Sequence, residues 1–109
     1  MGLITSTYRM MYLTAYQLTL ETKIQWISTA KMELLTSHDE IMSLGSDLEP
    51  DNPAVKQLEA RRDKLAVLEK KLDMQLKDYQ TRLQAVQTEL KSCEDATKNA
   101  IDRSFSYQL

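Results

Sequence analysis

Residues that break a regular backbone are scarce in this sequence. Its 109 residues include two glycines, two prolines and one phenylalanine, which argues against a sandwich, a barrel or a loop-rich enzyme. A single cysteine, Cys93, excludes an intramolecular disulfide and a cysteine-based metal site. The formal net charge of -2 gives no electrostatic reason to expect nucleic acid as a partner.

Long apolar runs are missing as well. No segment reaches the roughly 18 uninterrupted apolar residues that a stable membrane span needs. A secretory signal is not expected either, because threonine and glutamine interrupt the apolar-leaning segment 10–20 and no small-residue cleavage site follows it. Gly2 and Ser6 match the loose myristoylation pattern, which many unrelated chains match by chance.

The stretch 44–53 is the one place where the sequence signals a break in helical structure. It contains both prolines and Gly45, which can adopt the left-handed conformation that ends a helix. Asn52 offers a side-chain oxygen to the free amides of a new helix, and Pro53 suits the first helical position. The predicted turn residues are Gly45, Pro50, Asp51, Asn52 and Pro53.

Apolar residues recur at a strict interval of seven on both sides of this turn, which is typical of the seam along which two helices pack. A second apolar row runs beside the later series, at Leu68, Leu76, Leu83 and Leu90, and the steps between the two rows contain one four-residue insertion near 72–76, which locally relaxes a supercoil. The first series is Leu13, Leu20, Ile27, Leu34 and Ile41, and the second is Leu58, Leu65, Leu72, Tyr79, Val86, Cys93 and Ala100.

The pattern predicts an all-α fold, in which two long antiparallel helices form a helical hairpin or coiled coil. The single domain, 1–109, is expected to have a helix over 5–44, a turn over 45–52, a helix over 53–105 and a tail over 106–109. Symmetry about this turn pairs residues whose numbers add to roughly 97. It therefore places Leu34 near Arg62 or Asp63, and Leu13 near Leu83 or Val86.

Two helices alone do not cover the apolar side chains of this chain. Before Glu21 the only charged side chain is Arg9, and a helix that is apolar most of the way round must be covered on several sides. The residues after Ala96 have no expected partner within the chain. We therefore expect assembly of the chain with itself into a higher oligomer or filament, through Tyr8, Met11, Tyr12, Leu18, Ala100, Ile101, Phe105 and Leu109.

Groups for catalysis are not expected to meet. The only histidine is His38 and the only cysteine is Cys93, and the hairpin places them far apart along its axis. His38 is followed by Asp39 and Glu40, but neighbouring helix positions point in different directions. We expect no catalytic, cofactor-binding or metal site, and no enzyme.

The turn also carries a resemblance. Pro50-Asp51-Asn52-Pro53-Ala54, followed by a leucine-rich polar helix, resembles the loop of bacterial type III secretion needle subunits, and Ile101-Asp102-Arg103-Ser104-Phe105 resembles their C-terminal segment. The resemblance covers about a fifth of the chain. It implies a helical hairpin that is exported without a cleavable signal, with a cytosolic chaperone as a partner before export. It also implies stacking into a hollow extracellular filament whose inner wall is lined by the C-terminal helices.

Two functions follow from these observations. The first is a structural, self-assembling subunit of a needle-like secretion filament, located outside the cell or at its surface. The alternative is a soluble coiled-coil adaptor or secretion chaperone of fixed oligomeric state, located in the cytoplasm. Both explain the two seams, and the first also explains the apolar residues outside them.

Overall fold

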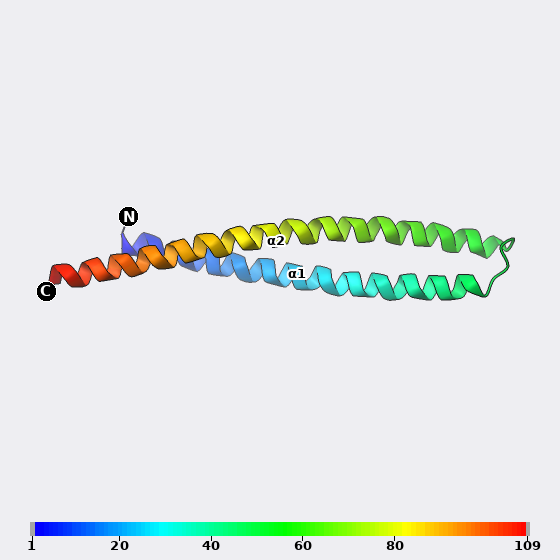
Figure 1. Ribbon diagram of the computed structural model, residues 1–109, viewed down its shortest axis with the longest axis horizontal. Helices are drawn as coiled ribbons and strands as arrows, with labels where there is room; N and C mark the ends of the chain where they lie inside the picture. Colours follow the sequence, from blue (N-terminus) through cyan, green and yellow to red (C-terminus); the bar gives the residue numbers. More distant parts are fainter. Residues whose placement is uncertain (1, 109) are drawn as a thin grey trace. The chain divides into compact units, whose positions relative to one another are not determined.

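A computed structural model describes residues 2–108 of the chain, with side chains described for residues 2–106. In this part the chain forms two helices and no strand: α1 (Leu3–Ser46) and α2 (Pro53–Gln108). The helices run antiparallel and are joined by the connection 47–52 (Figure 1). The predicted all-α helical hairpin is confirmed.

The helices extend further than the sequence pattern indicates. α1 begins at Leu3 rather than residue 5, and the expected tail over 106–109 is helical through residue 108. The first turn of α1 is closed by the Ser6 amide, which donates to the Gly2 carbonyl at 3.2 Å. Thr7 adds a hydrogen bond from its hydroxyl to the Leu3 carbonyl at 2.8 Å.

Gly45 does not end α1 in the left-handed conformation. It lies inside the helix with Ser46, and no residue from 2 to 108 has a positive φ. The carbonyls of the last turn find partners without such a residue, since Gly45 O accepts from the Leu48 amide at 3.4 Å and Ser43 O accepts from the Ser46 hydroxyl at 2.8 Å. The helix therefore continues two residues past its expected end.

The start of α2 follows the sequence closely. Asn52 Oδ1 accepts a hydrogen bond from the Ala54 amide at 2.9 Å, and Asn52 O accepts from the Val55 amide at 2.9 Å. This is the geometry of a helix N-cap, with Pro53 at the first helical position, where its missing N–H costs nothing. The cap fixes the point at which the chain becomes helical again.

The chain divides into two compact units, and each contains one segment of α1 beside one segment of α2. Unit 1 comprises Met1–Lys23 and Tyr79–Leu109, and unit 2 comprises Ile24–Asp78. In unit 1 the buried side chains of Leu13, Leu20 and Val86 form a cluster. The predicted proximity of Leu13 to Val86 is confirmed. Half-buried side chains pack around this cluster: Tyr16, Tyr79, Leu83, Leu90 and Cys93.

In unit 2, the neighbours of Leu34 differ from the expected ones, Arg62 or Asp63. Leu34 lines a groove with Leu68 and Leu72, whereas Arg62 lines a different groove with Ile41. The expected pairing placed the turn at 45–52, but the connection covers 47–52, which moves its midpoint toward the C-terminus. This later midpoint accounts for part of the shift at Leu34, while Leu13 still lies near Val86 as expected.

Candidate functional site

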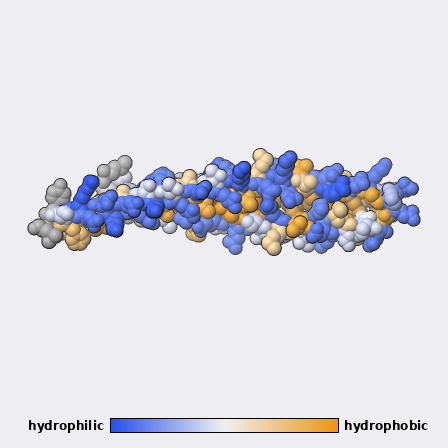
Figure 2. All heavy atoms as spheres, in the orientation of Figure 1, coloured by the Kyte–Doolittle hydropathy of each residue, from blue (hydrophilic) through white to orange (hydrophobic). Residues whose placement is uncertain are grey.

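The N-terminal part of α1 carries large apolar side chains that the fold leaves exposed. The exposed fraction is 73% for Ile4, 69% for Tyr8, 64% for Met11, 59% for Tyr12 and 65% for Leu18. On the face drawn in Figure 2, apolar residues lie among hydrophilic ones at the surface. Contact with water is unfavourable for side chains of this kind, so this surface is the candidate functional site.

These residues have a regular spacing of their own. Ile4, Met11 and Leu18 follow one another at intervals of seven residues. Tyr8 and Ala15, which alternate with them along the sequence, are also seven residues apart. At about 100° per residue, these positions fall on the side of α1 opposite the buried residues Leu13 and Leu20. We call this set the outer stripe; it consists of Ile4, Tyr8, Met11, Ala15 and Leu18.

The outer stripe was only partly predicted. Tyr8, Met11 and Leu18 were expected to make subunit contacts, whereas Ile4 and Ala15 were not considered. The missed signal was the interval of seven, which appears on this face as it does on the buried one. Tyr12, also predicted as a contact, flanks the stripe and stacks on Tyr16 with a ring-centroid distance of 6.2 Å.

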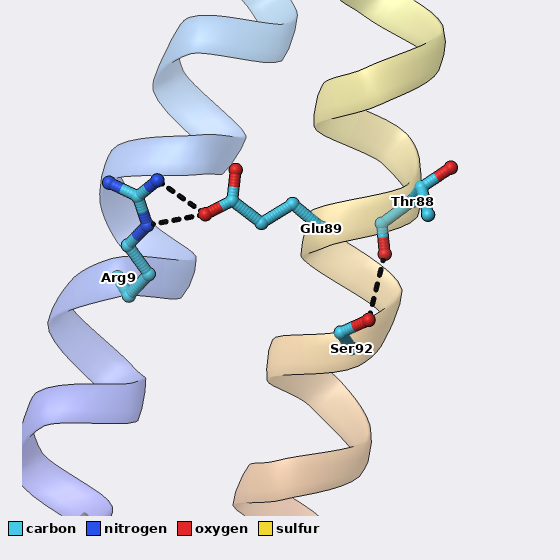
Figure 3. A network of polar contacts seen from close by, with 4 residues as sticks. All are labelled: Arg9, Thr88, Glu89 and Ser92. Atoms are coloured by element: carbon cyan, nitrogen blue, oxygen red, sulfur yellow. Dashed lines mark hydrogen bonds and ion pairs between the residues drawn. The ribbon is translucent and has the colours of Figure 1, made fainter.

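The only charged side chain of this segment is turned toward α2. Arg9 Nε donates to Glu89 Oε1 at 3.0 Å, and Arg9 Nη2 donates to the same oxygen (Figure 3). The hydrogen bond to Glu89 raises the pKa of Arg9 above its ordinary value. The guanidinium carbon also lies 5.3 Å from the ring centroid of Tyr12. The charge of Arg9 is therefore neutralised within unit 1, and the outer stripe itself carries no charge.

Polar side chains on α2 near this ion pair are occupied as well. The Ser92 hydroxyl donates to the Thr88 carbonyl at 3.2 Å, one turn back along its own helix (Figure 3). Thr97 Oγ1 donates to the sulfur of Met10 at 3.3 Å, which joins α2 to α1. The contact between Thr97 and Met10, with the ion pair of Arg9, joins the inner side of α1 to α2, and the outer stripe lies on the opposite side of α1.

The second group of predicted contact residues lies near the end of α2. Ile101 is 41% exposed and Phe105 is 62% exposed, while Ala100 is half-buried. Leu109, the last predicted contact, lies outside the described residues. Unit 1 thus presents two apolar surfaces, the outer stripe and the pair Ile101 and Phe105.

Of the predicted turn residues, Gly45 lines a groove with Ile41 and Leu58. Pro50, Asp51 and Pro53 are exposed, and Gly45 and Asn52 are half-buried. Their observed role is structural, because Asn52 caps α2 and Gly45 continues α1.

Chemistry-bearing residues are dispersed over the two units. His38 belongs to unit 2, where its Nδ1 lies 4.0 Å from Asp39 Oδ1, and Cys93 belongs to unit 1, where it packs against the core. From residue 2 to residue 108, no group of three or more His, Cys, Asp or Glu side chains is arranged to hold a metal ion. Within the same range, neither helix has the length and apolar content required to cross a membrane.

Comparison of the chain with protein-family models, with curated proteins and with solved structures gives no match. The proposals below therefore depend on the geometry of this chain and on the resemblance of its turn and C-terminal segment. The observation with the most consequence is the exposed, uncharged outer stripe.

Proposed function

We propose that the chain is a structural subunit that assembles with copies of itself into a helical filament, like the needle of a bacterial type III secretion system. The observation that carries this proposal is the outer stripe of α1, which is apolar, regularly spaced and exposed. A surface of this kind on a secreted or cell-surface protein requires a partner to cover it.

The proportion of buried to exposed apolar side chains supports assembly. Among the described residues, four hydrophobic side chains are buried and sixteen large hydrophobic side chains are exposed. Two helices can bury only one stripe each against the other. The hydrophobic effect then favours contacts between copies, because such contacts remove further apolar surface from water.

Exposed apolar side chains on both helices of unit 1 support a filament in particular. Open-ended growth needs contacts that a closed pair of subunits cannot satisfy, so a subunit must have at least two binding surfaces. In unit 1 these are the outer stripe and the pair Ile101 and Phe105. The resemblance of the Pro50–Pro53 turn to needle subunits adds the rest of the proposal: export without a cleavable signal, chaperone binding before export, and a hollow filament.

Substitution of Ile101 by Asp tests the proposal. We expect the parent protein to pellet in the ultracentrifuge and the Ile101→Asp variant to stay in the supernatant, because a carboxylate would be buried without a partner in the contact. Val67→Asp is the matched control, since Val67 is a β-branched residue on α2 that is 66% exposed and outside both surfaces. If Ile101→Asp sediments as heavily as the parent, the end of α2 is not a polymer contact.

The competing function is a coiled-coil adaptor of fixed stoichiometry. The observation that favours it is the seven-residue spacing of the outer stripe, which suits a single partner helix. Light scattering over a range of protein concentrations separates the two functions. A mass that continues to grow with concentration supports the filament, whereas a constant mass supports the adaptor.

A further inference from the structure

We infer that the outer stripe packs against the outer stripe of a second copy, with the two α1 helices antiparallel and a two-fold axis at Met11. The inference rests on the proposed function only in taking self-association as its starting point. It adds the partner surface, the orientation and the register of the contact. The occupant of the stripe is thus a second copy of this chain rather than a different protein.

The charge distribution favours a second copy. In a two-fold contact the same surface is present on both sides, so a stripe that carried charge of one sign would repel itself. The outer stripe contains no charged residue, and the one charge of the segment, Arg9, is paired with Glu89 of its own chain. A partner of opposite charge has no group on the stripe to recognise.

The size of the stripe also suits a dimer. Taking roughly 100 Å² for a fully exposed aliphatic side chain and roughly 200 Å² for a tyrosine, the exposed fractions of Ile4, Tyr8, Met11, Tyr12 and Leu18 give about 450 Å² of apolar surface per copy. Two copies together would then bury about 900 Å². A stable interface of about 1,600 Å² is about 60% apolar, or about 950 Å². Together with the flanking Tyr12, the stripe therefore supplies the apolar part of one standard interface.

The sizes of the residues determine the orientation. In an antiparallel pair centred on Met11, residues whose numbers add to 22 lie at the same level, so Ile4 lies opposite Leu18, and Tyr8 lies within one residue of the level of Ala15, the nearest stripe residue of the partner. The large ring of Tyr8 then fills the space that Ala15 leaves, which close packing requires. A parallel pair would place Tyr8 beside Tyr8 and Ala15 beside Ala15, with crowding at one level and a void at the other. The antiparallel arrangement is therefore the one in which the side chains fill the space between the two helices evenly.

This contact closes at two copies and cannot by itself produce a filament. The antiparallel dimer is therefore the building block, and growth has to use a different surface. Ile101 and Phe105 provide that surface in unit 1. Disruption of the outer stripe and disruption of the end of α2 should accordingly have different effects, on dimer formation in the first case and on growth in the second.

Cysteine cross-linking tests the orientation and the register. In a Cys93→Ala background, the Met11→Cys variant is oxidised with copper phenanthroline and separated on a non-reducing gel. We expect a cross-linked dimer, because the two-fold axis brings residue 11 of both copies within disulfide range. Leu18→Cys alone should stay monomeric on the gel, whereas a mixture of Ile4→Cys and Leu18→Cys chains should form a heterodimer. Efficient cross-linking of Leu18→Cys alone would indicate a parallel pair and overturn the inference.

Charge insertion tests the contact without cross-links. In the Ile101→Asp background, which stays in solution, sedimentation equilibrium should show that Met11→Glu raises the dimer dissociation constant by about a hundred-fold, as expected at the centre of an interface. Met74→Glu is the matched control, because Met74 is 70% exposed on α2 and lies outside the stripe, and it should leave the constant unchanged. Circular dichroism checks that both variants stay helical, and the exposure of Met11 makes loss of folding unexpected.

The outcomes separate this inference from the proposed function. Filaments that form without a Met11→Cys cross-link, and that are unaffected by Met11→Glu, would overturn the inference and leave the proposed function standing. A cross-linked dimer that never grows with concentration would support the inference and contradict the filament. A protein that is monomeric at all concentrations would contradict both.

Discussion

Substitution of Gly45 by Ala and by Asn reveals how α1 ends. The sequence pattern suggests a left-handed glycine at this position, whereas the structure places Gly45 inside α1 with no positive φ. The two descriptions predict opposite orders of stability. In a left-handed site the order is Gly, then Asn, then Ala, because a Cβ is unfavourable there and Asn tolerates it best. In a helix the order is Ala, then Asn, then Gly.

The structure also sets the expected magnitude. A Cβ built on Gly45 meets only Leu58 Cδ1, at 4.0 Å, which is an ordinary van der Waals contact. No steric cost therefore opposes the gain in helix propensity, and we expect Gly45→Ala to raise the free energy of unfolding by about 0.5–1 kcal/mol. Gly45→Asn should fall between the two. In the left-handed case, Gly45→Ala would instead cost about 1–2 kcal/mol.

Urea denaturation followed by far-ultraviolet circular dichroism measures the difference. The three proteins should have equal m values, so that the midpoints compare directly. The concentration is kept low enough that association does not contribute. The helical assignment of Gly45 would be refuted if the midpoint of Gly45→Ala were lower than that of the parent and the midpoint of Gly45→Asn lay between the two.

Two further pairs of substitutions test the hairpin in the same assay. Asn52→Ala should lower the free energy of unfolding by about 1 kcal/mol, because it removes the cap on the Ala54 amide, whereas Asn52→Ser should retain most of the stability. An equal loss of stability in both variants would show that the cap does not contribute. Leu20→Ala should cost about 2–4 kcal/mol because Leu20 is 1% exposed in the core of unit 1, whereas Leu35→Ala, at a position that is 60% exposed, should cost less than about 1 kcal/mol. Similar losses for the two leucines would mean that the core is placed wrongly.

The sequence predicts the hairpin because its strongest signals are local. The interval of seven identifies the buried stripe at Leu13 and Leu20, and the Asn52-Pro53 pair identifies the first residue of α2. The end of α1 was less predictable, because Gly45 is compatible both with a helix and with a left-handed cap. The choice depends on whether the Leu48 amide and the Ser46 hydroxyl reach the last carbonyls, which the sequence does not specify.

The later start of the turn accounts for part of the error in pairing. It adds about two to the sum of the paired residue numbers, whereas Leu34 lies still further along α2, in a groove with Leu68 and Leu72 rather than with Arg62. The ion pair of Arg9 with Glu89 was not predicted for a related reason. It depends on the register of the helices and on the direction in which two long side chains extend.

The outer stripe shows a different limit of sequence reasoning. Tyr8, Met11 and Leu18 were predicted as contact residues because they are large and apolar. Ile4 was missed because the expected helix began at residue 5, and Ala15 was missed because a small side chain adds little to a count of apolar residues. Ala15 nevertheless matters to the packing, because only a small residue leaves room for a tyrosine from a partner helix.

The two helices differ in what they present away from the core, and this difference constrains any assembly. In unit 1, α1 presents the uncharged outer stripe, while α2 presents charged residues such as Lys91, Glu94 and Lys98. An assembly that buries the outer stripe gains apolar contacts at no cost in charge desolvation, whereas one that buries the far side of α2 must desolvate ions of both signs. In the proposed filament, α1 and the pair Ile101 and Phe105 therefore belong at the contacts between copies, and the charged face of α2 belongs at a water-filled surface. The C-terminal helices of needle subunits occupy such a surface, the inner wall, so the polar face of α2 and the apolar face of α1 favour the same arrangement for independent reasons.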